Sequence, residues 1–181
     1  MYEWIPQKTN QKARNAVFLL LGGAAALMVF PILFSDLPFR WVVQLLAFVL
    51  LTVAIFLVAR YTAKAYVYRV LPREDGSRDL TVTELKAGKT RMIVCRIGLG
   101  GIQTRLLADT AHAAEAEALL TKGKKARQPF FDYCVDLKPA QSILLVAEEG
   151  GERMTIRLSY DPTLFDLLTP TATEEQDEDE P

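Results

Sequence analysis

Two apolar runs decide the fold: AVFLLLGGAAALMVFPILF at Ala16–Phe34 and, six residues later, WVVQLLAFVLLTVAIFLVA at Trp41–Ala59. Neither contains a charged residue, and each is 19 residues long. As a helix, each run would extend about 28 Å, close to the roughly 30 Å hydrocarbon core of a bilayer. Helices satisfy their own backbone hydrogen bonds, which lipid cannot do. The pair therefore predicts a transmembrane hairpin. A soluble core hairpin is disfavoured, because a 20.3 kDa chain has little other surface to cover it.

The flanking charges predict how the hairpin is oriented. The connector Ser35–Arg40 (SDLPFR) is too short to recross a membrane, so both chain ends should lie on the same side. Basic residues gather at those ends, namely Lys8, Lys12, Arg14, Arg60, Lys64 and Arg69. The positive-inside rule then predicts a two-pass protein of the cell membrane with both termini in the cytoplasm. A cleaved signal peptide is the alternative, but the long first run ends in PILFSD without a small-x-small cleavage site.

Small residues in the first run are candidates for helix packing. Gly22, Gly23 and Ala26 would let a neighbouring helix approach closely. We favour packing inside the hairpin, against Ala47 and Ala54, and leave open a homo-oligomer formed through the same residues. Neither run contains an ionisable residue, which argues against an ion-coupled transporter.

Charge is unevenly distributed along the rest of the chain. The formal net charge is −1, yet Glu174–Glu180 (EEQDEDE) carries six carboxylates, which leaves a net +5 on the remainder. We expect a disordered acidic tail over 169–181 and a body suited to an anionic inner leaflet. The leader at 1–15 is expected to be either a surface-lying anchor or a disordered segment. The two cysteines, Cys95 and Cys134, should be reduced thiols in the cytoplasm.

Residues 61–168 predict an antiparallel β domain, so the fold class is α+β. Hydrophobic residues alternate with period two in several short segments separated by turns. The expected strands are 64–71, 80–83, 91–97, 130–137, 142–147 and 153–158, the first three forming a meander. An Ala-rich helix is expected over Asp109–Leu120, and a final helix begins at Pro162 with Asp161 as its N-cap.

The order of these elements resembles bacterial PH-like (pleckstrin-homology-like) membrane proteins. The likeness is carried by Tyr66-Val-Tyr68 just past the second span, by Lys89–Ile97, and by Ser159-Tyr-Asp-Pro162 with Leu167-Leu168. It covers roughly Ala16–Leu168. The resemblance implies a bent antiparallel sheet forming a partly open barrel, a C-terminal helix closing one end, and no enzyme activity. The helix at Asp109–Leu120 departs from the family pattern, which leaves the strand order open.

The sequence contains no convincing catalytic, cofactor or metal site. Gly98-Leu-Gly100-Gly101 lacks the third glycine of a nucleotide fingerprint and is interpreted as a turn. The single histidine, His112, is interpreted as a surface residue, and a cysteine in a strand is usually an inert buried thiol.

One basic run is the candidate binding site. It consists of Lys122, Lys124, Lys125 and Arg127, four cations within six positions. The simpler interpretation is a solvated linker, and the functional one is contact with anionic lipid head groups. Nucleic acid is not expected, because no aromatic residues are interleaved with the cations.

We therefore expect a membrane-anchored, non-catalytic cytoplasmic interaction domain. Its partner would be membrane lipid or an unknown protein. The alternative is an accessory subunit of a larger membrane complex that uses the hairpin as its interface.

Overall fold

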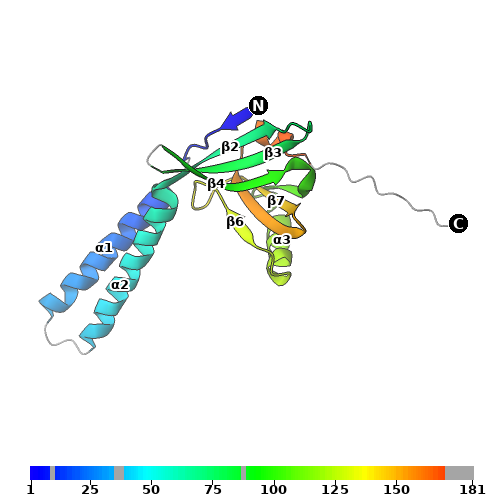
Figure 1. Ribbon diagram of the computed structural model, residues 1–181. Coiled ribbons are helices and arrows are strands. Elements are labelled where there is room, and N and C mark those ends of the chain that lie inside the picture. The colour runs from blue at the N-terminus through cyan, green and yellow to red at the C-terminus, as the bar shows by residue number, and fades with distance from the viewer. Residues whose placement is uncertain (9–10, 35–38, 87–88, 170–181) are drawn as a thin grey trace.

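The computed structural model describes residues 1–8, 11–34, 39–86 and 89–169. A helical hairpin projects from a β domain built of two four-stranded sheets (Figure 1). The α+β class predicted from the sequence is confirmed. The connector residues 35–38, the turn residues 87–88 and the predicted acidic tail from residue 170 onward lie outside the described residues.

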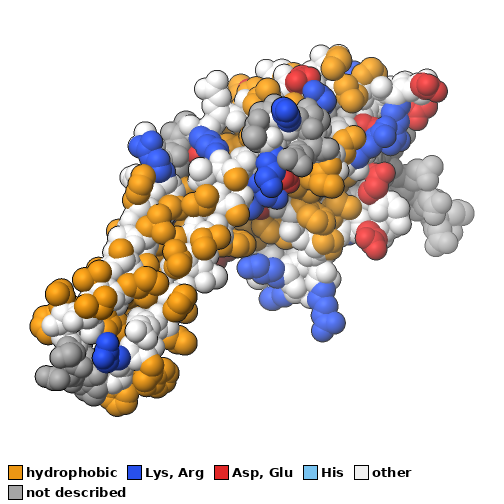
Figure 2. Space-filling model, turned by 60° about the vertical axis from the view of Figure 1, so that its left-hand side comes forward, with side chains coloured by type: hydrophobic (Ala, Val, Ile, Leu, Met, Phe, Trp, Pro, Cys, Tyr) orange, Lys and Arg blue, Asp and Glu red, His pale blue; other side chains and the backbone are white. Residues whose placement is uncertain are grey.

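The hairpin consists of α1 (Lys12–Leu33) and α2 (Arg40–Leu57), which η1 (Val58–Thr62) extends as a π-helical turn. The buried residues of each helix recur every seven positions: Val17, Ala24 and Pro31 on α1, and Ala47 and Ala54 on α2. Small side chains at this spacing allow the two helices to pack closely along their length. Their outer surfaces are covered with exposed hydrophobic side chains (Figure 2). Both helices are long and apolar enough to cross a membrane.

The first sheet joins the leader to the predicted meander. Its order is β1-β2-β3-β4, all antiparallel, with β1 at Tyr2–Trp4, β2 at Lys64–Pro72, β3 at Arg78–Lys86 and β4 at Lys89–Gly98. The meander is confirmed. The sequence did not predict that Tyr2–Trp4 of the leader forms a strand, which pairs with Tyr68–Val70 of β2.

The second sheet has the order β5-β7-β8-β6. Its strands are β5 (Ile102–Ala108), β6 (Phe130–Asp132), β7 (Ser142–Glu149) and β8 (Glu152–Ser159). The sequence did not predict β5. The strand expected over 130–137 was wrong beyond Asp132: residues 133–136 are all buried instead of alternating, and the backbone N–H of Cys134 donates to the Asp132 side chain at 3.0 Å. The remaining three-residue strand β6 runs parallel to β8.

The helix predicted over Asp109–Leu120 is displaced toward the C-terminus. Helix α3 spans Ala113–Lys125, and the side chain of Asp109 accepts from the backbone N–H of His112 at 2.9 Å just before it. Lys122, Lys124 and Lys125 therefore belong to the last turn of a helix, so interpreting the basic run as a linker was wrong for them. Gly123 is buried in that turn, where a Cβ would lie 3.2 Å from the Thr155 hydroxyl of β8. The missing side chain brings the end of α3 close against the sheet.

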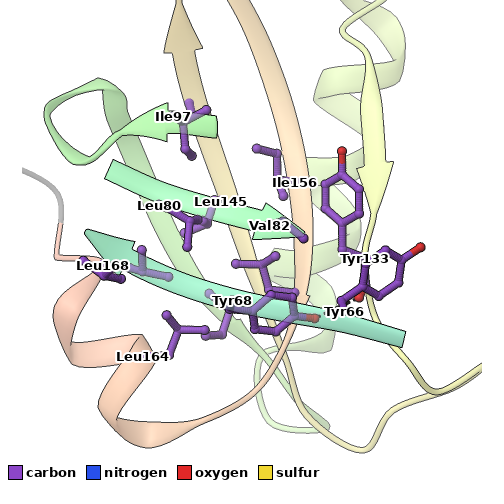
Figure 3. Close-up of a cluster of buried hydrophobic side chains, with 14 of the residues drawn as sticks. Tyr66, Tyr68, Leu80, Val82, Ile97, Tyr133, Leu145, Ile156, Leu164 and Leu168 are labelled. Atoms are coloured by element: carbon purple, nitrogen blue, oxygen red, sulfur yellow. Dashed lines mark hydrogen bonds between the residues drawn. The ribbon is translucent and has the colours of Figure 1, made fainter. Parts of the chain in front are cut away.

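The core lies between the two sheets and is closed by the C-terminal helix (Figure 3). Helix α4 (Pro162–Leu167) begins as predicted, with the Asp161 carboxylate accepting from the backbone N–H of Leu164 at 2.9 Å. Leu164 and Leu168 are fully buried against both sheets. The buried Tyr68 hydroxyl donates to the Tyr133 carbonyl at 2.8 Å and accepts from the backbone N–H of Ser159 at 3.2 Å. These bonds tie β2 to the second sheet.

Candidate functional site

Arg60, in the π-helical turn at the end of the hairpin, fixes the hairpin to the β domain. Its guanidinium donates to the Tyr66 hydroxyl at 3.0 Å and to the carbonyl of Asp132, and lies 3.9 Å from the Asp132 carboxylate. The same group lies 5.1 Å from the Tyr61 ring centroid and 5.6 Å from that of Tyr66. One cation thus contacts both sheets, through β2 and β6. The placement of the β domain beside the hairpin therefore rests on side-chain contacts as well as on chain connectivity.

The basic end of α3 lies close to this junction. From Asp132, which binds Arg60, the chain runs back through Phe131 and Phe130 to Pro129, whose carbonyl accepts from the backbone N–H of Thr155 at 2.9 Å. A further bond, from the Gln128 N–H to the Gly123 carbonyl at 2.9 Å, closes the end of α3. Residues 126–132, which connect the end of α3 to the Arg60 contact, therefore form a short segment that is fixed to β8.

The four predicted site residues are brought together there and all are exposed. Lys122, Lys124 and Lys125 occupy the last turn of α3, and Arg127 follows with a left-handed φ of 54°. In Figures 1 and 2, α3 points to the side on which the hairpin extends, and blue basic side chains project from that end of the domain. A structural role accounts for part of this pattern, because cations at a helix C-terminus offset its dipole. Offsetting the helix dipole does not require four cations, nor does it require α3 to point to the same side as the hairpin.

Carboxylates occupy the opposite end of the β domain. The turns after β2 and after β7 carry five carboxylates (Glu74, Asp75, Glu148, Glu149 and Glu152) against three neighbouring cations (Arg73, Arg78 and Arg153), and Figure 2 shows red side chains, with some blue ones among them, on the side away from the hairpin. Near the hairpin, Asp132 is engaged by Arg60, and Glu84 pairs with Lys64 at 2.9 Å. The end of the domain next to the hairpin is therefore the electropositive one.

Two phenylalanines, which the sequence did not single out, lie between the hairpin and the basic end of α3. Phe130 and Phe131 are 46% and 40% exposed. The Phe131 ring stacks on that of Tyr133, with centroids 6.2 Å apart and planes 5° apart. The Tyr133 hydroxyl in turn donates to the Val94 carbonyl of β4 at 3.0 Å. The exposed Phe131 ring therefore has a fixed support.

The helix-packing candidates separate between two faces of the hairpin. Gly23 is partly buried, and a Cβ there would lie 3.5 Å from Leu50 of α2. Gly22 and Ala26 are exposed on the outer surface, and a Cβ on Gly22 would meet nothing within 4 Å. The hairpin interior therefore accounts for Gly23 but not for the other two.

The reactive residues considered from the sequence are dispersed. Burial raises the pKa of the Cys95 thiol to about 11 and also raises that of Cys134, which keeps both thiols protonated at neutral pH. His112 is exposed and its Nδ1 lies 2.8 Å from the Asp109 carboxylate. Within the described part of the chain, no group of three His, Cys, Asp or Glu residues could hold a metal ion.

The glycine turn between the sheets faces a carboxylate. Leu99–Gly101 forms a 3-10 turn between β4 and β5, and the Gly98 N–H donates to the Glu149 carboxylate at 3.3 Å. A negative side chain beside these amides would oppose a bound phosphate.

A cleft beside the start of α1 also has mixed charge. It holds about 360 Å³, and its lining includes Trp4, Lys12, Asp136, Lys138 and Tyr160. A nearly buried carboxylate among its lysines makes it a poor receptor for a simple anion.

Comparisons of this chain with protein-family models, with curated proteins and with solved structures find no match. The functional argument therefore rests on the residues and contacts described above.

Proposed function

We propose that this chain is a membrane-anchored, non-catalytic interaction protein. Its hairpin crosses the cell membrane twice, with both termini in the cytoplasm. The β domain rests on the inner leaflet, and Lys122, Lys124, Lys125 and Arg127 bind anionic lipid head groups. The observation that carries this proposal is the shared direction of the hairpin and the basic end of α3, which the Arg60–Asp132 contact links.

The energetics favour lipid as the partner. Each cation near an anionic leaflet contributes about 1 kcal/mol, so the four residues together represent about 4 kcal/mol. A contact of that size would be weak for a free domain, but the hairpin holds this one at high effective concentration beside the membrane. The acidic turns at the other end of the domain would be repelled by the same surface, which favours one orientation.

The proposal predicts that anionic lipids are enriched near the end of α3. We would label Ala126→Cys with a fluorophore in the full-length chain in nanodiscs, since the raised pKa values of Cys95 and Cys134 disfavour their labelling. Head-group spin-labelled phosphatidylglycerol should quench the label several-fold more than spin-labelled phosphatidylcholine. The double variant Lys124→Gln, Lys125→Gln removes about 2 kcal/mol of attraction, so the ratio of quenching by phosphatidylglycerol to quenching by phosphatidylcholine should fall toward one. High salt should lower the same ratio, because it screens the attraction.

The matched control for this experiment is Arg78→Gln, which removes an exposed cation from the start of β3, next to the turn after β2. It should leave the quenching ratio unchanged. A ratio near one for the unmodified protein at low salt would contradict the proposal.

The exposed Gly22 and Ala26 favour a second candidate, an accessory subunit that packs its hairpin against another membrane protein. Gly22→Leu adds a bulky side chain at a position where a Cβ would meet nothing within 4 Å. We expect it to dissociate any assembly that co-purifies with the protein in mild detergent, whereas Val53→Leu, at an exposed position of α2, should not. An assembly that survives Gly22→Leu would remove this candidate.

A further inference from the structure

We propose that Phe130 and Phe131 form an apolar wedge that inserts among the lipid head groups beside the hairpin. The wedge would add a hydrophobic contact to the electrostatic one, and this inference rests on the proposed function. Its chemical partner is the boundary between the head groups and acyl chains of the inner leaflet.

The position of the pair comes from contacts on both sides of it. Asp132, the next residue, binds Arg60 at the end of the hairpin. On the other side, Pro129 is held by Thr155 and Gln128 by Gly123, so the basic end of α3 follows directly. The backbone that carries the two aromatic side chains is therefore held between a helix proposed to cross the membrane and the cations proposed to contact its surface.

The exposure of the pair follows from the sheet order. Strand β6 is the last strand of its sheet, paired only with β8 among the described residues, so its side chains lack a neighbour on the outer edge. In the described residues outside the hairpin, the other exposed large hydrophobic side chains are Met92 and Ile93 of β4 and, on either side of β1, Met1 and Ile5. Two adjacent exposed phenylalanines are costly in water unless another surface covers them.

Lipid is favoured over a protein strand as that surface because of the charges around the pair. The nearest charged side chains toward α3 are Arg127 and the lysines of its last turn, all of them exposed, and aromatic residues beside basic ones are typical of interfacial membrane contacts. The stacking of Phe131 on Tyr133 keeps its ring in place, so little side-chain freedom is lost when the wedge is buried.

The test places a single indole in the wedge of the full-length protein. With W4F and W41F removing the native tryptophans, F130W should be quenched at least threefold more strongly by lipids brominated near the head-group end of the acyl chain than E74W, which lies in the turn after β2. Aqueous iodide should quench the two indoles in the reverse order. F131W provides a second reporter, and a β-sheet circular dichroism spectrum confirms that each variant is folded.

The outcomes separate this inference from the proposed function. Equal lipid quenching of F130W and E74W would overturn the wedge, and the anionic-lipid enrichment at residue 126 would then decide the proposed function by itself. Shielding of F130W from both brominated lipid and iodide would also overturn it, since a protein surface would then cover the pair. Strong lipid quenching without anionic enrichment would support the wedge and contradict the electrostatic contact.

Discussion

Joining Lys8 to Thr62 through a short Gly-Ser linker is expected to give a soluble, folded β domain that keeps β1 but lacks the hairpin. A fragment that begins at residue 61 is expected to melt roughly 15 °C lower, corresponding to about 3 kcal/mol for a domain of this size. The junction is feasible because Lys8 Nζ already donates to the Thr62 carbonyl at 2.9 Å.

The expected loss comes from three contacts of β1. The Tyr2 hydroxyl donates to the Asp161 carboxylate at 2.5 Å, Glu3 pairs with Arg69 at 2.9 Å, and the Trp4 ring lies 5.6 Å from that of Tyr68. The buried part of Trp4 and the lost hydrogen bonds together account for a few kcal/mol.

Circular dichroism melts of the linked protein and of the fragment that begins at residue 61 measure the difference directly. In the linked protein, Trp4→Ala should reproduce much of the loss, whereas Ile5→Ala, at an exposed position, should not. Equal melting temperatures with and without β1 would contradict the role assigned to the leader.

The parts of the fold that could be predicted are those with a strong local signal. The hairpin follows from two runs without charge, the meander from the alternation in β2 and β3 and the β-rich composition of β4, and α4 from the Asp161-Pro162 start. Strand β1 has no comparable signal, because it is three residues long and its partner lies more than 60 positions away. Its pairing depends on tertiary contacts that no local window contains.

The sequence predicted the basic residues of the candidate site but not how the structure places them. The basic run could be found from its charges, yet the predicted helix ended at Leu120, whereas α3 continues to Lys125 and passes Thr155 at Gly123. Phe130 and Phe131 fit an ordinary alternating strand in the sequence. Their exposure follows from the parallel pairing of β6 with β8, which leaves β6 at the sheet edge. Arg60 was considered only for its charge, although its contacts determine where the domain sits.

Gly101→Ala is expected to destabilise the β domain by about 3 kcal/mol, because over-packing against a backbone that cannot easily move is costly. A Cβ at this position would lie 2.4 Å from the carbonyl oxygen of Glu148 at the end of β7. The adjoining Ile102 is fully buried and paired with Ala147, so the start of β5 has little room to shift. Thermal melts of the full-length protein in nanodiscs should show the loss as a fall of roughly 15 °C in the β-sheet transition.

Gly100, in the same turn as Gly101, provides the matched control for Gly101→Ala. A Cβ on Gly100 would meet nothing within 4 Å, and its φ lies outside the left-handed region, so Gly100→Ala should leave stability unchanged or raise it by up to about 1 kcal/mol. A nucleotide-binding loop would behave differently: ATP would raise the melting temperature of the unmodified protein. We expect no such rise, since the Gly98 amide is already engaged by the Glu149 carboxylate. Equal melting temperatures for the two alanine variants would show that Gly101 is not required for the close approach of β5 to β7.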